Sequence, residues 1–325
     1  MGRVWCALVG LALLVAPAGA QRAPGAFRVL SWNVSGLSPV ERADSFRGHL
    51  RLAEPDILLL DEVEGTMSPE AFRQALQDPR AAGPAWHTVW GARGGRQRIV
   101  MAARTPLTPI EAFQKNTYPG RDIEAVVAAA PADAKVRIRK ELANGIPVNA
   151  STLEIAGRRL LLVAVDLQCC GGEWQEVRRL AEARQVRRLV DDAIRAVQPH
   201  GVILAGDFNL AVPSAGEAGI GALPLVVLSG PYAPSIHGLI AAEARQRDGR
   251  DVWTINSGAN SPFPHMPFDF QLYSPHTLRA LTAEVMDTAD YPAAELKPAG
   301  LYPAASRDFS DHLPVVVTYD WRGIQ

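Results

Sequence analysis

Short runs of apolar, β-branched residues recur along the chain, separated by polar and turn-forming positions. Runs of this length are typical of β-strands rather than helices. Several of them are apolar on both faces, as strands are in a sheet that is covered on each side. The predicted strands are Phe27–Trp32, Asp56–Glu62, Arg98–Ala103, Leu160–Asp166, Gly201–Asp207, Phe268–Tyr273 and Leu313–Tyr319.

Apolar residues spaced three and four apart predict helices between these strands. The clearest helix covers Trp174–Val197, with one apolar face and one face of Arg and Glu, and it ends before Pro199. A second helix is expected to begin at Ser68-Pro69, because Ser is a favourable N-cap and Pro suits the first helical position. A third covers Arg42–Ala53.

Strands and helices alternate along the chain without a repeat or an obvious linker, which predicts one α/β domain over residues 21–325. The chain of 325 residues is close to the ~250–300 residues at which a single core stops growing. Segment Thr105–Asn149 mixes Pro, Gly, Ala and charged residues. We expect it to form an insertion with its own hairpin, or a loop at the rim.

The first twenty residues have the pattern of a secretory signal peptide. Arg3 precedes an uncharged apolar run from Val4 to Ala16, and small residues follow up to Ala20. A membrane anchor is the alternative, but the run is shorter than the ~20 residues that span a bilayer. We therefore expect cleavage between Ala20 and Gln21, no transmembrane segment in the mature chain, and a secreted or periplasmic protein.

Composition narrows the function classes. The sequence is 48% hydrophobic and 21% charged, as globular proteins are, and its formal net charge is -1. This balance gives no support to a broad electrostatic surface for nucleic acid or membrane. After cleavage only Cys169 and Cys170 remain, too few for a disulfide scaffold or a cysteine zinc site. A monomer is expected.

Several catalytic motifs are absent: the sequence has no G-x-S-x-G, no H-E-x-x-H, no P-loop and no complete dinucleotide-binding glycine motif. Polar residues instead follow the apolar strands. The residues at the ends of predicted strands are Asn33, Asp61, Glu62, Asp166, Asp207 and Asn209, and Asp311 and His312 stand just before the last strand.

One such residue has an ordinary explanation, since Asp and Asn commonly end strands. Polar residues of this kind stand at five strand ends of one chain, and this recurrence favours a shared functional site. Carboxylates and amides with one imidazole and no thiolate form an oxygen-rich pocket that suits Mg²⁺ or Mn²⁺.

Four segments, in this order along the chain, resemble the motifs of the endonuclease/exonuclease/phosphatase superfamily: Phe27–Asn33, Pro55–Val63, Val202–Asn209 and Ser310–Val315. Weaker similarity lies in Arg98–Arg104 and in Asp269. The resemblance implies a four-layer α/β sandwich, in which two mixed β-sheets pack face to face with helices outside. It also implies a metal-dependent phosphoesterase, a class that includes deoxyribonucleases, abasic-site endonucleases, neutral sphingomyelinases and inositol-phosphate phosphatases.

The resemblance also implies a role for each matching residue. Glu62 is the expected metal ligand, Asn33 contacts metal-bound water or phosphate, and Asp311 approaches the metal through water. Asp207 orients and deprotonates the attacking water, and Asn209 donates to the phosphate. His312 hydrogen-bonds a phosphoryl oxygen, with Asp269 orienting its ring. In-line displacement at phosphorus needs such a division between nucleophile positioning and charge neutralisation.

Asp166 departs from the family pattern, because many relatives place His there and abasic endonucleases place Tyr. Three outcomes are open: it joins the metal cluster, stays protonated through burial, or ends its strand facing solvent. For the neighbouring pair Cys169-Cys170 we favour two small buried thiols or a strained local disulfide over a redox switch.

These observations predict a secreted, Mg²⁺-dependent phosphodiesterase or phosphomonoesterase. A secreted binding protein that has lost turnover on the same scaffold is the first alternative, and a non-enzymatic transport or adhesion domain is the second. The substrate stays open. Arginines in the Gly91–Arg98 loop would suit nucleic acid, the apolar stretch Phe263–Phe268 would suit a phospholipid headgroup, and a sugar phosphate is equally compatible.

Overall fold

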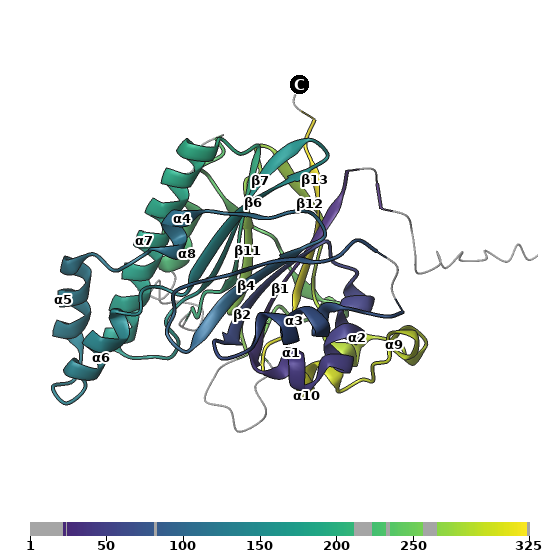
Figure 1. The fold of residues 1–325 in the computed structure, drawn as a ribbon, viewed down its shortest axis with the longest axis horizontal. Helices are drawn as coiled ribbons and strands as arrows, with labels where there is room; N and C mark the ends of the chain where they lie inside the picture. Colours follow the sequence, from purple (N-terminus) through teal and green to yellow (C-terminus); the bar gives the residue numbers. More distant parts are fainter. Residues whose placement is uncertain are drawn as a thin grey trace, which may run out of the picture.

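The computed structural model describes residues 22–23, 25–80, 83–210, 223–231, 235–255 and 265–323. Two mixed β-sheets pack face to face with helices on both outer faces, as Figure 1 shows. This arrangement confirms the predicted four-layer α/β sandwich. The predicted signal peptide, its cleavage point and part of the apolar stretch before Asp269 lie outside the described residues.

The first sheet has seven strands in the order β10-β12-β13-β1-β2-β4-β3. Its strand β1 runs parallel to β2 and antiparallel to β13. The bounds are β1 Phe27–Gly36, β2 Ile57–Glu64, β3 His87–Trp90, β4 Gln97–Ala103, β10 Arg245–Gln246, β12 Leu278–Val285 and β13 Val315–Trp321.

The second sheet has six strands in the order β5-β6-β7-β8-β11-β9. Its strands β7 and β8 are parallel, and the remaining pairs are antiparallel. The bounds are β5 Thr108–Pro109, β6 Val148–Ile155, β7 Arg158–Asp166, β8 Gly201–Asp207, β9 Ile240–Ala241 and β11 Asp269–Tyr273.

Helices on the seven-stranded side are α1 Ser38–Glu41, α2 Ala43–Ala53, α3 Pro69–Leu76, α9 Ala293–Ala299 and α10 Ala305–Phe309, with a 3₁₀ turn at Thr288–Asp290. Helices on the six-stranded side are α4 Glu111–Gln114, α5 Gly120–Ala129, α6 Lys135–Leu142, α7 Glu173–Val197 and α8 Leu223–Ser229. Both groups are seen in Figure 1. No helix in the described part of the chain is long and apolar enough to cross a membrane.

Alternating side chains of the strands build three apolar layers. On β2, Leu59 faces the other sheet, whereas Leu58 and Leu60 face the helices. The same alternation on β7 sends Leu162 between the sheets and Leu161 towards α7. Every central strand is therefore covered on both faces, which explains its continuous apolar sequence.

The predicted helices appear where expected. The Ser68 side chain accepts a hydrogen bond from the backbone N–H of Ala71 and caps α3. Helix α7 ends at Val197, and its C-cap residue Gln198 directly precedes Pro199. Its buried side also carries Arg179 and Glu182, which the predicted apolar face did not include.

Other expectations were wrong. Segment Thr105–Asn149 forms no hairpin of its own, because it folds into α4, α5 and α6, and its short strand β5 pairs with β6. The predicted last strand begins at Val315 rather than Leu313. Strands β3, β6 and β12 were not predicted, because they are short or rich in polar and charged residues.

Candidate active site

Strand alternation brings Asn33 and Asp61 to the same edge of the sandwich. The two residues are direct partners in the parallel ladder of β1 and β2. Each lies two residues beyond a side chain that faces the other sheet, Ser31 in β1 and Leu59 in β2. Asn33 and Asp61 therefore continue the inter-sheet layer at its end, and each is only 1% exposed.

A bulge in β2 changes the direction of Glu62. The register between β2 and β4 shifts between Leu60 and Val63, and Glu62 adopts φ 53°. Such left-handed backbone is unfavourable for Glu and is found preferentially at functional sites. The bulge places the half-buried Glu62 carboxylate beside Gln97, whose Nε2 donates to Glu62 Oε2 at 2.7 Å.

The second sheet supplies three more carboxylates. Asp166 and Asp207 are register partners at the carboxyl ends of the parallel strands β7 and β8. Asp269, at the start of β11, is the antiparallel partner of Asp207 on its other side. Gly206 has φ 132°, and a Cβ atom there would lie 2.0 Å from the carbonyl oxygen of Val165. Only glycine allows β8 this close approach just before Asp207.

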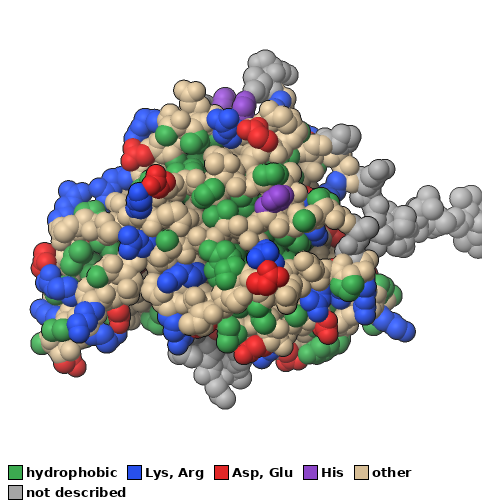
Figure 2. Space-filling model, in the orientation of Figure 1, with side chains coloured by type: hydrophobic (Ala, Val, Ile, Leu, Met, Phe, Trp, Pro, Cys, Tyr) green, Lys and Arg blue, Asp and Glu red, His purple; other side chains and the backbone are tan. Residues whose placement is uncertain are grey.

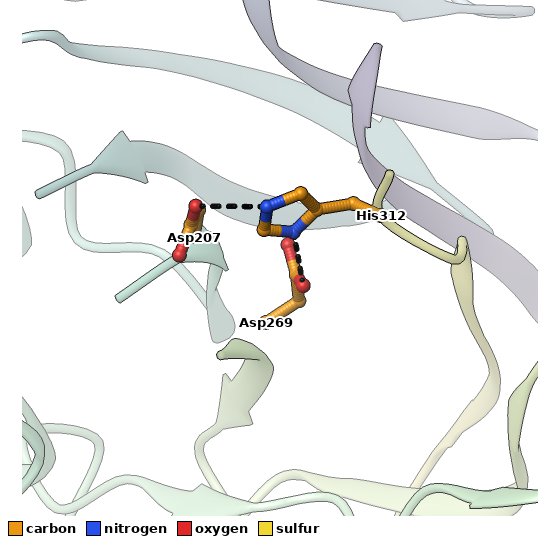
Figure 3. Close-up of side chains that lie close together, drawn as sticks. All are labelled: Asp207, Asp269 and His312. Atoms are coloured by element: carbon orange, nitrogen blue, oxygen red, sulfur yellow. Dashed lines mark hydrogen bonds and ion pairs between the residues drawn. The ribbon is translucent and has the colours of Figure 1, made fainter. Parts of the chain in front are cut away.

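His312 lies between two of these carboxylates, as Figure 3 shows. Its Nδ1 atom is 2.8 Å from Oδ2 of Asp269, and its Nε2 atom is 3.7 Å from Oδ2 of Asp207. The backbone carbonyl of His312 accepts a hydrogen bond from Trp32 Nε1 at 2.9 Å. The His312 side chain is 7% exposed, and these contacts hold its position and orientation.

Asn209 joins Asp207 to the loop after β7. The Asn209 backbone N–H donates to Asp207 Oδ1, and its side-chain amide donates to the carbonyl of Leu167, both at 2.8 Å. Two buried side chains of α7 hold the next residues of this loop. Arg179 donates to the carbonyls of Gln168 and Cys170, and Glu182 accepts from the Gln168 N–H.

Burial and mutual repulsion raise the pKa values of the carboxyl groups. Burial is the largest cause for Asp61, Asp166 and Asp207, and for Asp61 and Asp166 the neighbouring carboxylates follow. For Asp207 the cationic His312 opposes the effect of burial, but the pKa still rises to about 7. The pKa values of Asp61 and Asp166 rise well above their ordinary range. For His312 burial acts in the opposite direction, but Asp269 and Asp207 outweigh it and raise its pKa well above the ordinary value. The imidazole is therefore protonated at neutral pH.

The donor set fits a hard divalent cation. Among the described residues, two groups of three side chains bring their ligand atoms within 4.8 Å of one another. These groups are Asp207, Asp269 and His312, and Asp61, Asp166 and Asp207. Both carboxylate oxygens of Asp61 are buried and find no hydrogen-bond partner among the described residues. Carboxylate oxygens without donors are the ligands that Mg²⁺ and Mn²⁺ take.

The structure places the other predicted residues as follows. Asn33 Oδ1 accepts from the Ser35 N–H, and exposed Asp311 accepts from the Ser35 hydroxyl. Asp311 belongs to neither three-residue group. Half-buried Asp166 brings a carboxylate oxygen within 4.8 Å of those of Asp61 and Asp207, which favours the first two of its three expected states over a strand end that faces solvent. The sequence predicted Asp61 only as a strand end and not as a member of this carboxylate cluster. Its position beside Glu62 was the signal that could have indicated it.

The vicinal cysteines differ from the expectation. Cys169 and Cys170 are exposed free thiols with their sulfurs 2.7 Å apart, so they are neither buried nor joined in a disulfide.

A cavity of about 290 Å³ opens beside Glu62 and Asp166. Its walls come from the loop before β4, from α6, from the loop after β7 and from α7. The charged residues that line it are Glu62, Arg96, Glu141, Asp166, Arg178 and Glu182. The carboxylates outnumber the arginines, so the cavity wall carries no excess of positive charge.

Solved structures with the same architecture extend over almost the whole chain. The human Nocturnin catalytic domain with bound sulfate has a TM-score of 0.55 and 18% identity, covering 92% of this chain and 96% of that chain. The Beutenbergia cavernae endonuclease/exonuclease/phosphatase has a TM-score of 0.62 and 17% identity, covering 92% and 72%. The Neisseria 3′ phosphatase NExo bound to a product DNA hairpin has a TM-score of 0.53 and 18% identity, covering 91% and 100%.

At these identities the solved structures establish the fold alone. No curated protein matches this chain in sequence. The sequence model of the endonuclease/exonuclease/phosphatase family matches residues 30–312, which include every candidate site residue described above. The chain therefore belongs to the endonuclease/exonuclease/phosphatase family.

Proposed function

We propose that this protein is a divalent-metal-dependent phosphoesterase that hydrolyses phosphodiester or phosphomonoester bonds by water attack. The observation that carries the proposal is the position of the His312 ring between Asp269 and Asp207. A protonated imidazole fixed on one nitrogen and open on the other is suited to bind a phosphoryl oxygen as negative charge develops there.

Asp269 and Asp207 have different tasks in this proposal. Asp269 accepts the Nδ1 hydrogen of His312 at 2.8 Å and holds the ring. The 3.7 Å between His312 Nε2 and Asp207 Oδ2 is too long for a direct hydrogen bond, so both atoms keep capacity for substrate and water. Asp207 Oδ1 is held by the Asn209 N–H, which leaves Oδ2 to orient and deprotonate the attacking water.

A divalent cation, Mg²⁺ or Mn²⁺, neutralises phosphoryl charge when bound. Glu62 and Asn33 would hold it, with exposed Asp311 at the rim. Glu62 and Asn33 occupy neighbouring strands, and Asn33 is held by the Ser35 N–H and linked through Ser35 to Asp311. All three offer oxygen, which is the appropriate ligand for these ions.

The cavity beside Glu62 favours a compact phosphoester over a long nucleic acid. Arg178 forms ion pairs with Glu182 and Glu141. Nε of Arg96 lies 3.6 Å from Oε2 of Glu64. These arginines therefore offer little unpaired positive charge to a polyanion. In Figure 2 Lys and Arg side chains lie along the side occupied by α5, α6 and α7, interspersed with Asp and Glu.

Release of nitrophenol from bis-p-nitrophenyl phosphate and p-nitrophenyl phosphate, with Mg²⁺ or with EDTA, tests the proposal. We expect metal-dependent turnover that His312→Ala abolishes and that the surface variant Asp192→Asn retains. Double-stranded DNA, RNA, sphingomyelin and inositol phosphates then identify the substrate class. Absence of turnover on all of them would favour the alternative of a non-catalytic binding protein. The reason to test this alternative is that carboxylates outnumber arginines around a cavity that would have to accept an anionic substrate.

We also propose that the chain is exported and cleaved after Ala20, on the basis of its signal-like first twenty residues. N-terminal sequencing of the protein recovered from the natural host is expected to begin at Gln21. An intact Arg3 in that protein would contradict the proposal.

A further inference from the structure

Asp61 is the most isolated carboxylate in the described part of the protein. Its side chain is 1% exposed, and neither Oδ atom has a hydrogen-bond partner among the described residues. A buried acceptor without a donor destabilises the folded protein, and a buried unpaired charge does so more strongly. Such a group requires a compensating ligand or a proton.

The side chains that Asp61 faces are also acidic. Asp166 and Asp207 reach it from the opposite sheet, and one oxygen of each lies within 4.8 Å of an Asp61 oxygen and of the other. No Lys or Arg in the described ranges forms an ion pair with any of the three. His312 lies 3.7 Å from Asp207, but its Nδ1 atom is held by Asp269.

The strands fix this arrangement. Asp166 and Asp207 are register partners on β7 and β8, and Asp61 is fixed on β2 as the register partner of Asn33. Because all three lie on strands rather than on flexible loops, the carboxylates cannot easily move apart. Carboxylate oxygens from both sheets line the space between these three residues.

We propose that Asp61, Asp166 and Asp207 hold a hard divalent cation, Mg²⁺, Mn²⁺ or Ca²⁺, at a site separate from the one at Glu62 and Asn33. Three carboxylate oxygens and no sulfur select such ions. The cation supplies the partner that Asp61 lacks and offsets the negative charge of the cluster. This site adds a second ion to the proposed phosphoesterase. Ion binding there does not depend on whether the protein hydrolyses a phosphoester.

Counting bound Mn²⁺ on the full chain, by equilibrium dialysis with electron paramagnetic resonance of the free ion, tests the proposal. The wild type is expected to bind two ions. Asp61→Asn and Asp166→Asn are each expected to lose one bound ion, or to bind that ion about tenfold or more weakly. Glu62→Gln is expected to keep that ion, and the exposed Asp192→Asn serves as the charge-matched control.

Two results would overturn the proposal. One is unchanged Mn²⁺ binding in both Asp61→Asn and Asp166→Asn. The other is a single ion in the wild type that Glu62→Gln removes as completely as Asp61→Asn does, because one shared ion then explains all the ligands. Circular dichroism of each variant confirms that it is folded. A chain that binds two ions but hydrolyses no phosphoester would refute the proposed function and leave this site standing.

Discussion

Nδ1 of His312 lies 2.8 Å from Oδ2 of Asp269, although the strands next to these two residues belong to opposite sheets of the sandwich. Asp269 begins β11 of the six-stranded sheet, and His312 precedes β13 of the seven-stranded sheet. Gln271 strengthens the same junction, since its Nε2 donates to the Val315 carbonyl at 2.9 Å. The relative position of the two sheets therefore determines the geometry of the site.

The first prediction concerns the reacting side chains. Asp207→Asn and His312→Ala are each expected to lower kcat by ~10²-fold or more, because both groups act mainly in the transition state. Both variants should keep the wild-type circular dichroism spectrum, since neither change adds volume. Steady-state kinetics on the best phosphoester of the substrate panel measure the effect. Turnover at the wild-type rate in either variant would contradict the assigned roles.

The second prediction concerns removal of metal. Because the folded-state pKa of Asp61 is raised by burial and by neighbouring carboxylates, its contribution to stability is present at low pH and is lost as the pH rises. In EDTA at pH 8, Asp61→Asn is therefore expected to be more stable than the wild type by about 1 kcal/mol or more. Urea denaturation at pH 5 and pH 8 measures the difference. If Asp61→Asn were less stable than the wild type at pH 8 in EDTA, the Asp61 carboxylate would not destabilise the metal-free fold as predicted.

The third prediction concerns His49, which is fully buried in α2. Burial lowers its pKa from 6.5 to about 4, its Nδ1 donates to the Ser45 carbonyl at 2.8 Å, and its Nε2 lies 3.3 Å from the Ser306 hydroxyl. The unfolded chain binds a proton at higher pH than the folded chain does, so stability is lost as the pH falls from 6.5 towards 4. The full loss is about 3 kcal/mol.

The free energy of unfolding between pH 7 and pH 4, compared between wild type and His49→Gln, isolates this contribution from general acid effects. The wild type should lose about 3 kcal/mol more than the variant over this range. Parallel pH profiles would show that His49 does not titrate as its burial implies.

The fourth prediction concerns Gly206. A Cβ atom at this position meets the Val165 carbonyl at 2.0 Å on backbone with φ 132°. Gly206→Ala is therefore expected to lower the free energy of unfolding by about 3 kcal/mol or more, with loss of metal binding at Asp207. Gly120→Ala, where nothing lies within 4 Å of the new Cβ, is the control and should be neutral or stabilising. Equal stability of the two variants would contradict the prediction.

The sequence predicts the central strands and the strand-end residues well because both depend on local signals. Continuous apolar runs identify β2, β7 and β8, and the polar residues after them mark the edge that carries the site. The position of Asp61 depends on more than this, because the bulge after Leu60 decides which of Asp61 and Glu62 faces the opposite sheet. No periodic pattern in the sequence specifies that bulge.

Helices α4, α5 and α6 were unpredictable for a different reason. Their few buried residues, such as Phe113, Val126 and Ile138, form an apolar face only when they pack on the six-stranded sheet and α7. Strand β6 is similar, because the buried Asn149 and Ser151 hide its strand character. Tertiary packing, which a single sequence does not display, specifies these elements.

The pairing of β1 with β13 has a consequence for biosynthesis. Trp32 donates to the carbonyl of His312, which lies 280 positions later in the chain, so the first strand of the site is synthesised long before its last partner. A chain still emerging from the ribosome therefore contains Asp61, Asp166 and Asp207 before it contains His312. The candidate site can therefore be completed only after synthesis has reached the last strand.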